Sequence, residues 1–206
     1  MKIYSVNDAE FKQFGRVINL DADELIKTAE KIPVPDSGAS YKASVEEFER
    51  LAIKDTIKDN YFGGMPTQIG YCWGHSNQMN ALEWHTCSEI NIGITDLILI
   101  MGDVRDIEDG NKYNSDNVKA FKLKKGEAIE VYATTLHYCP IEVSEDGFGC
   151  IVCLLEGTNT ALDTPVEDKR IFAKNKWLLA HNDNKALIDR GVCAGIYGPN
   201  HKICGE

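Results

Sequence analysis

Short strand-like runs fill the chain from residue 61 onward, and they restrict the possible folds more than any other feature. The runs are rich in Ile, Val, Tyr and Trp, and turns separate them. They lie near residues 67–73, 79–90, 95–101, 117–123, 127–133, 135–139 and 148–155. Strands that follow one another without intervening helices are typical of sandwiches and barrels. We therefore expect a mainly β fold.

The first sixty residues have a different pattern. Asp21 can begin a short amphipathic helix that Pro33 ends, and Ser44 with Glu47 fits a capping box for a second helix. We expect these helices to cover the outside of a sheet or to form a dimer contact. The predicted organisation is a single domain with three parts: a helical extension (1–60), a barrel core (61–160) and a closing segment (161–206).

Composition excludes several classes of partner. The 206 residues carry a formal net charge of −10, which argues against nucleic acid or an anionic membrane surface as partner. The start of the chain turns polar at once and has no apolar signal core. The seven cysteines are scattered, so we expect no disulfide framework and a cytoplasmic location. Cys150 and Cys153 lie in one strand-like run, and we interpret them as packed thiols facing opposite sides.

Three side chains that can bind metals occur close together in one predicted strand. Glu83, His85 and Glu89 are all at odd-numbered positions, so on a regular strand they point to the same face. One interpretation is a polar outer face with a stray histidine. The other is a face that lines a pocket and holds a metal ion.

His137 is the candidate for a ligand from elsewhere in the fold. It follows Gly126 by eleven positions, on a run in which apolar and polar residues alternate. With this second motif the sequence resembles the RmlC-like cupin superfamily, whose first motif is His-x-His followed by Glu and whose second motif runs from Gly to His. Here Glu83 stands in place of the first histidine, and Tyr132 and Thr134 replace the proline and second glycine of the second motif.

The chain also looks like a bacterial branch of cupins known as a domain of unknown function. The shared phrases include Asn80 to His85 and Thr135 to Pro140. This resemblance implies a cupin double-stranded β-helix, or jelly-roll, barrel with peripheral N-terminal helices.

The predicted metal set is His85, His137 and Glu89, with Glu83 as a fourth ligand or as a free catalytic base. Two imidazoles with one or two carboxylates suit Mn, Fe, Ni, Co or Zn. A thiolate ligand from Cys87 or Cys139 is a further alternative, although burial is the commoner role of a cysteine. Gln68, Tyr71, Asn80 and Tyr132 are the candidates for hydrogen bonds to a polar substrate. His75 is expected either at the pocket mouth or as a turn cap, and His181 and His201 as structural residues.

Such a pocket can serve several chemistries on a small-molecule substrate. We favour isomerisation or epimerisation of a carbohydrate, in which the metal stabilises an enediolate and Glu83 carries the proton. Several cupin families with similar ligand sets are sugar isomerases, which the resemblance makes relevant. The alternatives are lyase or hydrolase chemistry, an iron-dependent dioxygenase, and a non-catalytic cupin that binds a sugar or sugar acid. A homodimer is compatible with the resemblance.

Overall fold

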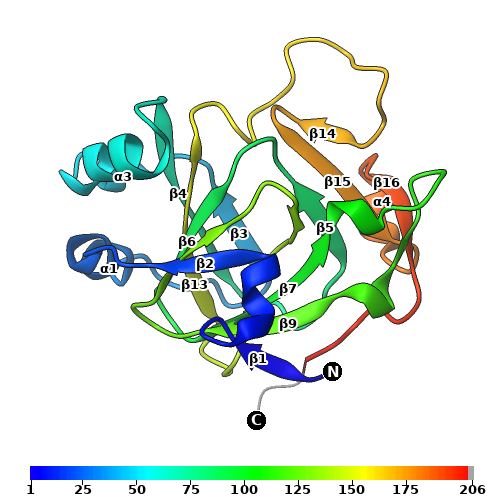
Figure 1. Cartoon of the computed structure of the whole chain (residues 1–206), viewed down its shortest axis with the longest axis horizontal. Helices are drawn as coiled ribbons and strands as arrows, with labels where there is room; N and C mark the ends of the chain where they lie inside the picture. The colour runs from blue at the N-terminus through cyan, green and yellow to red at the C-terminus, as the bar shows by residue number, and fades with distance from the viewer. Residues whose placement is uncertain (204–206) are drawn as a thin grey trace.

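Two facing β-sheets form the body of the protein (Figure 1). The computed structural model describes residues 1–203. The first sheet has six strands, in the spatial order β2 (Gly15–Ile18), β10 (Ala128–Val131), β6 (Glu89–Gly93), β13 (Phe148–Leu155), β4 (Thr67–Gly74) and β3 (Ala39–Lys42). The second sheet has the order β1 (Ile3–Ser5), β9 (Lys119–Leu123), β7 (Leu97–Asp103) and β11 (Thr135–Leu136), with β12 (Ile141–Glu142) also paired to β7.

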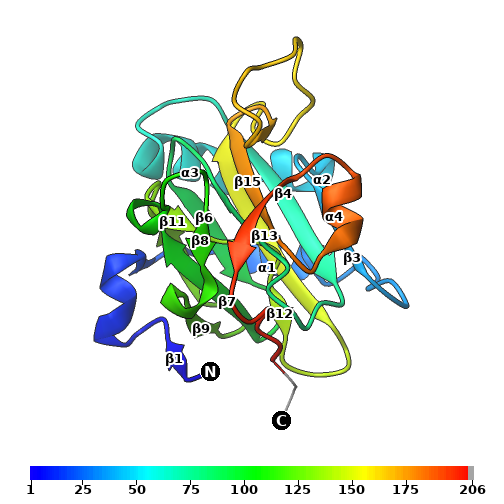
Figure 2. The ribbon, with the colours of Figure 1, turned by 90° about the vertical axis from the view of Figure 1, so that its right-hand side faces the viewer.

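A third group of strands extends the second sheet. β15 (Lys176–His181) pairs with β5 (Ala81–Trp84), and its other neighbours are β14 (Ile171–Ala173), β16 (Cys193–Tyr197) and, through β16, β8 (Tyr113–Asn114). A bridge between Glu83 and His137 connects β5 to the segment just after β11. The closing segment therefore adds strands beside β5, as Figure 1 shows for β15 and β16, and Figure 2 shows β15 in orange from another side.

The strand order identifies the architecture. The four central strands of one sheet are β4, β13, β6 and β10, and the opposing sheet runs from β5 through β11 and β7 to β9. Strands adjacent in space come from distant parts of the chain, as in the double Greek key of a jelly roll. The fold is a mainly β jelly-roll barrel, and the predicted fold class is confirmed.

Side chains of β13 show how the core is divided. Cys150 and Val152 face the barrel interior, where they join a cluster with Leu99 of β7. Ile151 and Cys153 face the opposite side and pack in a second cluster with residues of the helices. All four are buried, as the period of two along a strand requires. The two cysteines are free and lie on opposite faces, which confirms their interpretation as packed thiols.

Three helices cover the outside of the first sheet. They are α1 (Asp23–Ala29), α2 (Glu46–Glu49) and α3 (Ile53–Tyr61), and their buried side chains belong to the second cluster (Figure 1). A fourth helix, α4 (Lys185–Asp189), follows β15, and short 3-10 helices span Ala9–Gln13, Val104–Asp106 and Ser115–Asn117. Among the described residues no helix is both long and apolar enough to cross a bilayer.

Two predictions for the first sixty residues are wrong: that the segment is a helical extension, and that Ser44 and Glu47 form a capping box. The segment contains β1, β2 and β3 as well as helices, so it contributes strands to both sheets. The Ser44 hydroxyl donates to Glu49 at 2.7 Å, and the same Glu49 oxygen accepts the Ile69 backbone N–H at 2.7 Å. Glu49, rather than Glu47, is the partner of Ser44, and through Ile69 it also connects α2 to β4.

Candidate metal centre

The predicted strand over residues 79–90 is two strands, β5 and β6, which belong to different sheets. The chain leaves the first strand after Trp84. The Asn175 side chain accepts hydrogen bonds from the Thr86 backbone N–H at 2.9 Å and from its hydroxyl at 2.6 Å. These contacts give the polar groups of Thr86 hydrogen-bond partners where the crossing segment pairs with no strand. The alternation predicted that Glu83 and Glu89 share one strand face, and this prediction is wrong. The two side chains reach the same point from opposite sheets.

The structure brings all four predicted metal-binding side chains together. Glu83, His85, Glu89 and His137 are each less than a tenth exposed. One carboxylate oxygen of Glu89 lies 3.4 Å from His85 Nε2 and 3.3 Å from His137 Nε2. One potential ligand atom from each of Glu83, His85 and His137 lies within 4.8 Å of the others. A single ion can therefore be shared by these side chains.

Hydrogen bonds orient both imidazoles toward the cluster. His85 Nδ1 lies 2.7 Å from the Asn175 carbonyl and His137 Nδ1 lies 3.1 Å from the Thr135 carbonyl. A carbonyl only accepts, so both Nδ1 atoms carry hydrogen and both Nε2 atoms face inward. His85 Nε2 is buried without a hydrogen-bond partner. Imidazoles held this way by backbone carbonyls are common in metal sites, and the donor set suits a divalent first-row transition metal.

Opposing charges shift the pKa values of two members of the cluster. Burial by itself would raise the pKa of Glu89, but the charges of His137 and His85 and the hydrogen bond with His137 outweigh it and hold this pKa well below its usual range. Burial would lower the pKa of His137, but the Glu89 carboxylate raises it to about 9. Asn91 Nδ2 donates to the second Glu89 oxygen at 2.7 Å. Glu89 is therefore an ionised carboxylate fixed between the two imidazoles.

Glu83 has a partner that the sequence patterns did not indicate. Lys176, the first residue of β15, forms a buried ion pair with the Glu83 carboxylate. The Lys176 ammonium also lies 5.8 Å from the centre of the Tyr138 ring, within the range of a cation–π contact. Lys176 belongs to a run that fits either a short helix or a strand, and its pairing with β5 joins residues more than ninety positions apart. Such a long-range pairing has no local signal.

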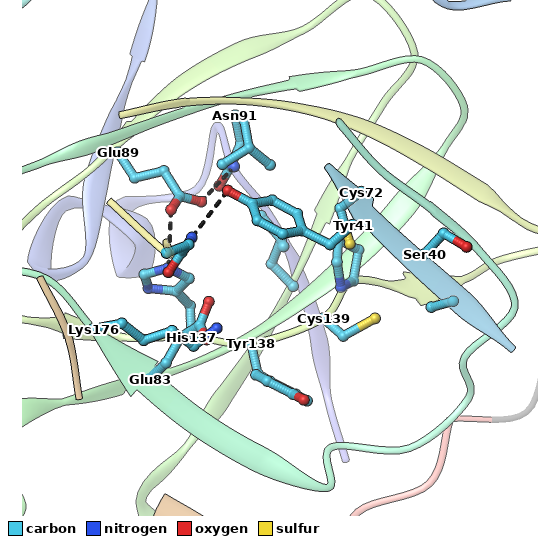
Figure 3. A pocket seen from close by; sticks show the side chains of 15 residues that line it. Ser40, Tyr41, Cys72, Glu83, Glu89, Asn91, His137, Tyr138, Cys139 and Lys176 are labelled. Atoms are coloured by element: carbon cyan, nitrogen blue, oxygen red, sulfur yellow. Dashed lines mark hydrogen bonds and ion pairs between the residues drawn. The ribbon is translucent and has the colours of Figure 1, made fainter. Parts of the chain in front are cut away.

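A cavity of about 180 Å³ opens beside the cluster (Figure 3). Its polar lining residues are Ser40, Tyr41, Glu83, Glu89, Asn91, His137, Tyr138, Asn159 and Lys176. The Tyr41 hydroxyl accepts a hydrogen bond from Asn159 Nδ2 at 2.9 Å. In Figure 3 the Tyr41 side chain reaches from β3 toward Glu89 and Asn91. Asn91 could have been found from the sequence, because it follows Glu89 by two positions on the same strand.

The five predicted substrate-binding residues lie outside this cavity lining. Gln68 uses its amide to hold the backbone of residues 157–158. Tyr71 faces the helices, where its ring packs on Phe48 and Trp73.

The other three are also engaged elsewhere. His75 Nδ1 contacts Glu142 at 2.7 Å. Asn80, with a positive φ of 60°, bonds to Asn184 and Asn200. Tyr132 pairs its backbone N–H with the Phe14 carbonyl. Alternation along a strand could not show which face looks into the barrel.

The remaining candidates have the expected surroundings in part. His181 and His201 each contact a backbone carbonyl through Nε2 at 3.0 Å, in agreement with structural roles. Cys139 lines the cavity, whereas Cys87 is held near Asn175. Within the described residues, the cluster of three potential ligands includes neither thiol.

Comparison with known proteins adds a family to this geometry. A family model described as a domain of unknown function, DUF4867, matches residues 3–201. The chain belongs to this family. Among curated proteins, none matches the DUF4867 chain in sequence.

Solved structures similar to the DUF4867 chain include two oxalate enzymes. An oxalate decarboxylase of Bacillus subtilis has 13% identity and a TM-score of 0.35, over 61% of this chain and 28% of the decarboxylase chain. An oxalate oxidase in complex with the substrate analogue glycolate has 15% identity and a TM-score of 0.37, over 61% of this chain and 56% of its own. The chain thus spans about a quarter of the decarboxylase's length.

Proposed function

We propose that this protein is a metal-dependent isomerase or epimerase that acts on a small carbohydrate-type substrate. The observation that carries the proposal is the largely buried ion pair between Lys176 and Glu83, the carboxylate that clusters with His85 and His137. His85, His137 and Glu89 would hold the ion, which we expect to be Mn, Fe, Ni, Co or Zn. When bound, a divalent ion supplies Lewis acidity that polarises a substrate carbonyl or hydroxyl.

Glu83 is positioned to move a proton. Both carboxylates line the cavity and lie close to the imidazoles, but of the two Glu83 is the one paired with the Lys176 ammonium. In the proposed reaction the Glu83 carboxylate takes a proton from the carbon next to a carbonyl and returns it to the same or the neighbouring carbon. Lys176 holds the Glu83 carboxylate in place through their ion pair and donates to the substrate oxygen on which negative charge develops.

Solvent deuterium exchange tests this proposal even when the product is unknown. Metal-loaded protein is incubated in D2O with pentoses, hexoses and their phosphates, and proton NMR follows loss of the carbon-bound hydrogen. The expected result is exchange on at least one compound by the wild type. Metal-loaded protein that binds a sugar but exchanges no hydrogen would instead support the non-catalytic sugar-binding alternative.

Two matched variants separate the roles of the carboxylates. Glu83→Gln should retain the metal and lose exchange by about 10²-fold or more, because the general base is gone. Glu89→Gln should lose the metal itself, because this carboxylate lies between both imidazoles. Loss of metal from Glu83→Gln would make Glu83 a ligand, and an unchanged Glu83→Gln would contradict its assigned role.

The proposal includes finer assignments that follow the family resemblance. These are the RmlC-like subtype, a cytoplasmic location and a homodimer. Light scattering on the purified protein tests the homodimer directly, with a mass near twice the 23.0 kDa chain as the expected result. A mass of one chain would contradict it.

A further inference from the structure

The charges around the cavity indicate which kind of molecule it accepts. The residues that line the cavity include two acidic side chains, Glu83 and Glu89, and one basic side chain, Lys176. They leave one net negative charge, which a divalent ion would convert into one net positive charge. The imidazoles add none, because a metal-bound histidine is neutral. A buried site with one excess positive charge favours a ligand with one negative charge.

Lys176 has hydrogen-bonding capacity left for such a ligand. Its side chain is 15% exposed, and within residues 1–203 its ionic partner is Glu83. An ammonium group has three N–H donors, so the contact with Glu83 leaves others free. Both Lys176 and Tyr138, whose ring lies beside the ammonium, line the cavity. The other N–H groups of Lys176 are therefore available to a ligand in the cavity.

Tyr41 supplies a second donor on another side of the cavity. Its hydroxyl oxygen accepts from Asn159, so the O–H hydrogen is not used in that bond. Figure 3 shows this side chain reaching in from β3, while Lys176 enters from the side of Glu83. The cavity volume is about 180 Å³. The cavity thus suits a small molecule with an anionic group and hydroxyl or oxo groups.

We propose that the substrate is a small monocarboxylate of the carbohydrate type, a hydroxy- or oxo-acid, whose negative charge is bound by Lys176 with a hydrogen bond from Tyr41. This proposal rests on the proposed function, because it names the substrate class of the same metal-dependent site. It distinguishes that class from neutral sugars, which lack a negatively charged group for the ammonium.

Calorimetric titration of manganese-loaded protein tests the proposal with glycerate and glycerol as probes. The two probes have the same number of carbons and differ in charge. The expected result is that glycerate binds about tenfold or more tightly than glycerol. Equal affinity for the two probes would overturn the proposal.

Variants separate the contribution of Lys176 from the attraction of the metal for any carboxylate. Lys176→Met should retain manganese and weaken glycerate binding about tenfold or more, because a charged hydrogen bond is lost. Lys176→Gln, which keeps an N–H donor for Glu83, should show the same weakening even if the Met variant fails to fold. Lys174→Met is the control, because Lys174 pairs with Asp163 and is 41% exposed. Glycerate binding that is equal in the Lys176 variants and the Lys174 control would overturn the proposal.

Failure of this inference and failure of the proposed function give different results. If neutral sugars exchange deuterium while glycerate binds no better than glycerol, the isomerase stands and the carboxylate substrate is wrong. If glycerate binds through Lys176 and no sugar or sugar acid exchanges, the substrate class stands and catalysis is wrong.

Discussion

His137 is the residue on which the charge state of the metal centre depends most directly. Its Nε2 lies 3.3 Å from the Glu89 carboxylate, which raises its pKa to about 9. At neutral pH the imidazole is therefore protonated before an ion arrives. A histidine binds a metal ion in its neutral form, so binding of the ion displaces this proton into solvent.

The apparent metal affinity should consequently depend on pH. Below pH 9 the proton competes with the ion, and each unit of decreasing pH should weaken apparent affinity about tenfold. Titration of manganese between pH 6.5 and 8.5 measures this slope. Calorimetry in buffers of different ionisation enthalpy should show release of about one proton. An affinity independent of pH in this range would contradict the protonated state of His137.

At the scale of elements, the crossing between β5 and β6 assembles the ligands. Residues 85–88 connect the two sheets, and Asn175 holds them through its side chain and backbone. Its backbone carbonyl fixes the His85 ring, and its side chain fixes Thr86. The arrangement of the proposed ligands thus depends on a residue that contacts no predicted ligand with its own side chain.

Asn175→Gly should weaken metal binding. Asn175 has a positive φ of 53°, which glycine adopts without strain, so the substitution removes only the side-chain bonds. The expected loss of metal affinity is about 10- to 100-fold, as for other residues that orient ligands. Asn111→Gly is the matched control, because Asn111 also has a positive φ, 63°, and does not line the cavity beside the ligands. Equal metal affinity of the two variants would contradict the role of Asn175.

Local sequence patterns predicted part of this arrangement. The family motifs carry the positions of His85, Glu89 and His137, and the structure brings these three side chains together. Lys176 and Tyr41 could not be predicted, since each reaches the cavity through pairing with a strand distant in sequence.

The face of a strand was a second limit on prediction. Both sides of β4 are buried, one by the opposing sheet and one by helices. Period-two alternation therefore groups side chains correctly without showing which group faces the interior. Tyr71 was placed on the wrong side for this reason.

At the scale of the whole molecule, the N-terminal segment is packed into the barrel. Phe11 and Phe14 lie with their ring centres 5.3 Å from that of Phe121 on β9, and Tyr4 lies 5.8 Å away. Strand β1 pairs with β9 in parallel. This aromatic cluster closes one edge of the second sheet, so it is part of the core.

Phe121→Ala should therefore be strongly destabilising. Phe121 is fully buried, and truncation of such a side chain costs about 3–5 kcal/mol. Denaturant unfolding monitored by circular dichroism measures the change. Phe172→Ala, at a position 38% exposed, is the control and should change stability by about 0.5 kcal/mol or less. Similar stability losses in both variants would contradict the docking of the N-terminal segment.

Measurement of the metal content tests directly whether the imidazole–carboxylate cluster binds a divalent ion. Protein purified without a chelating tag is analysed by mass spectrometry alongside the double variant His85→Ala, His137→Ala. We expect near-stoichiometric Mn, Fe, Ni, Co or Zn in the wild type and none in the double variant. Wild-type protein that is free of metal and takes up none of these ions would contradict the metal centre and the chemistry proposed for it.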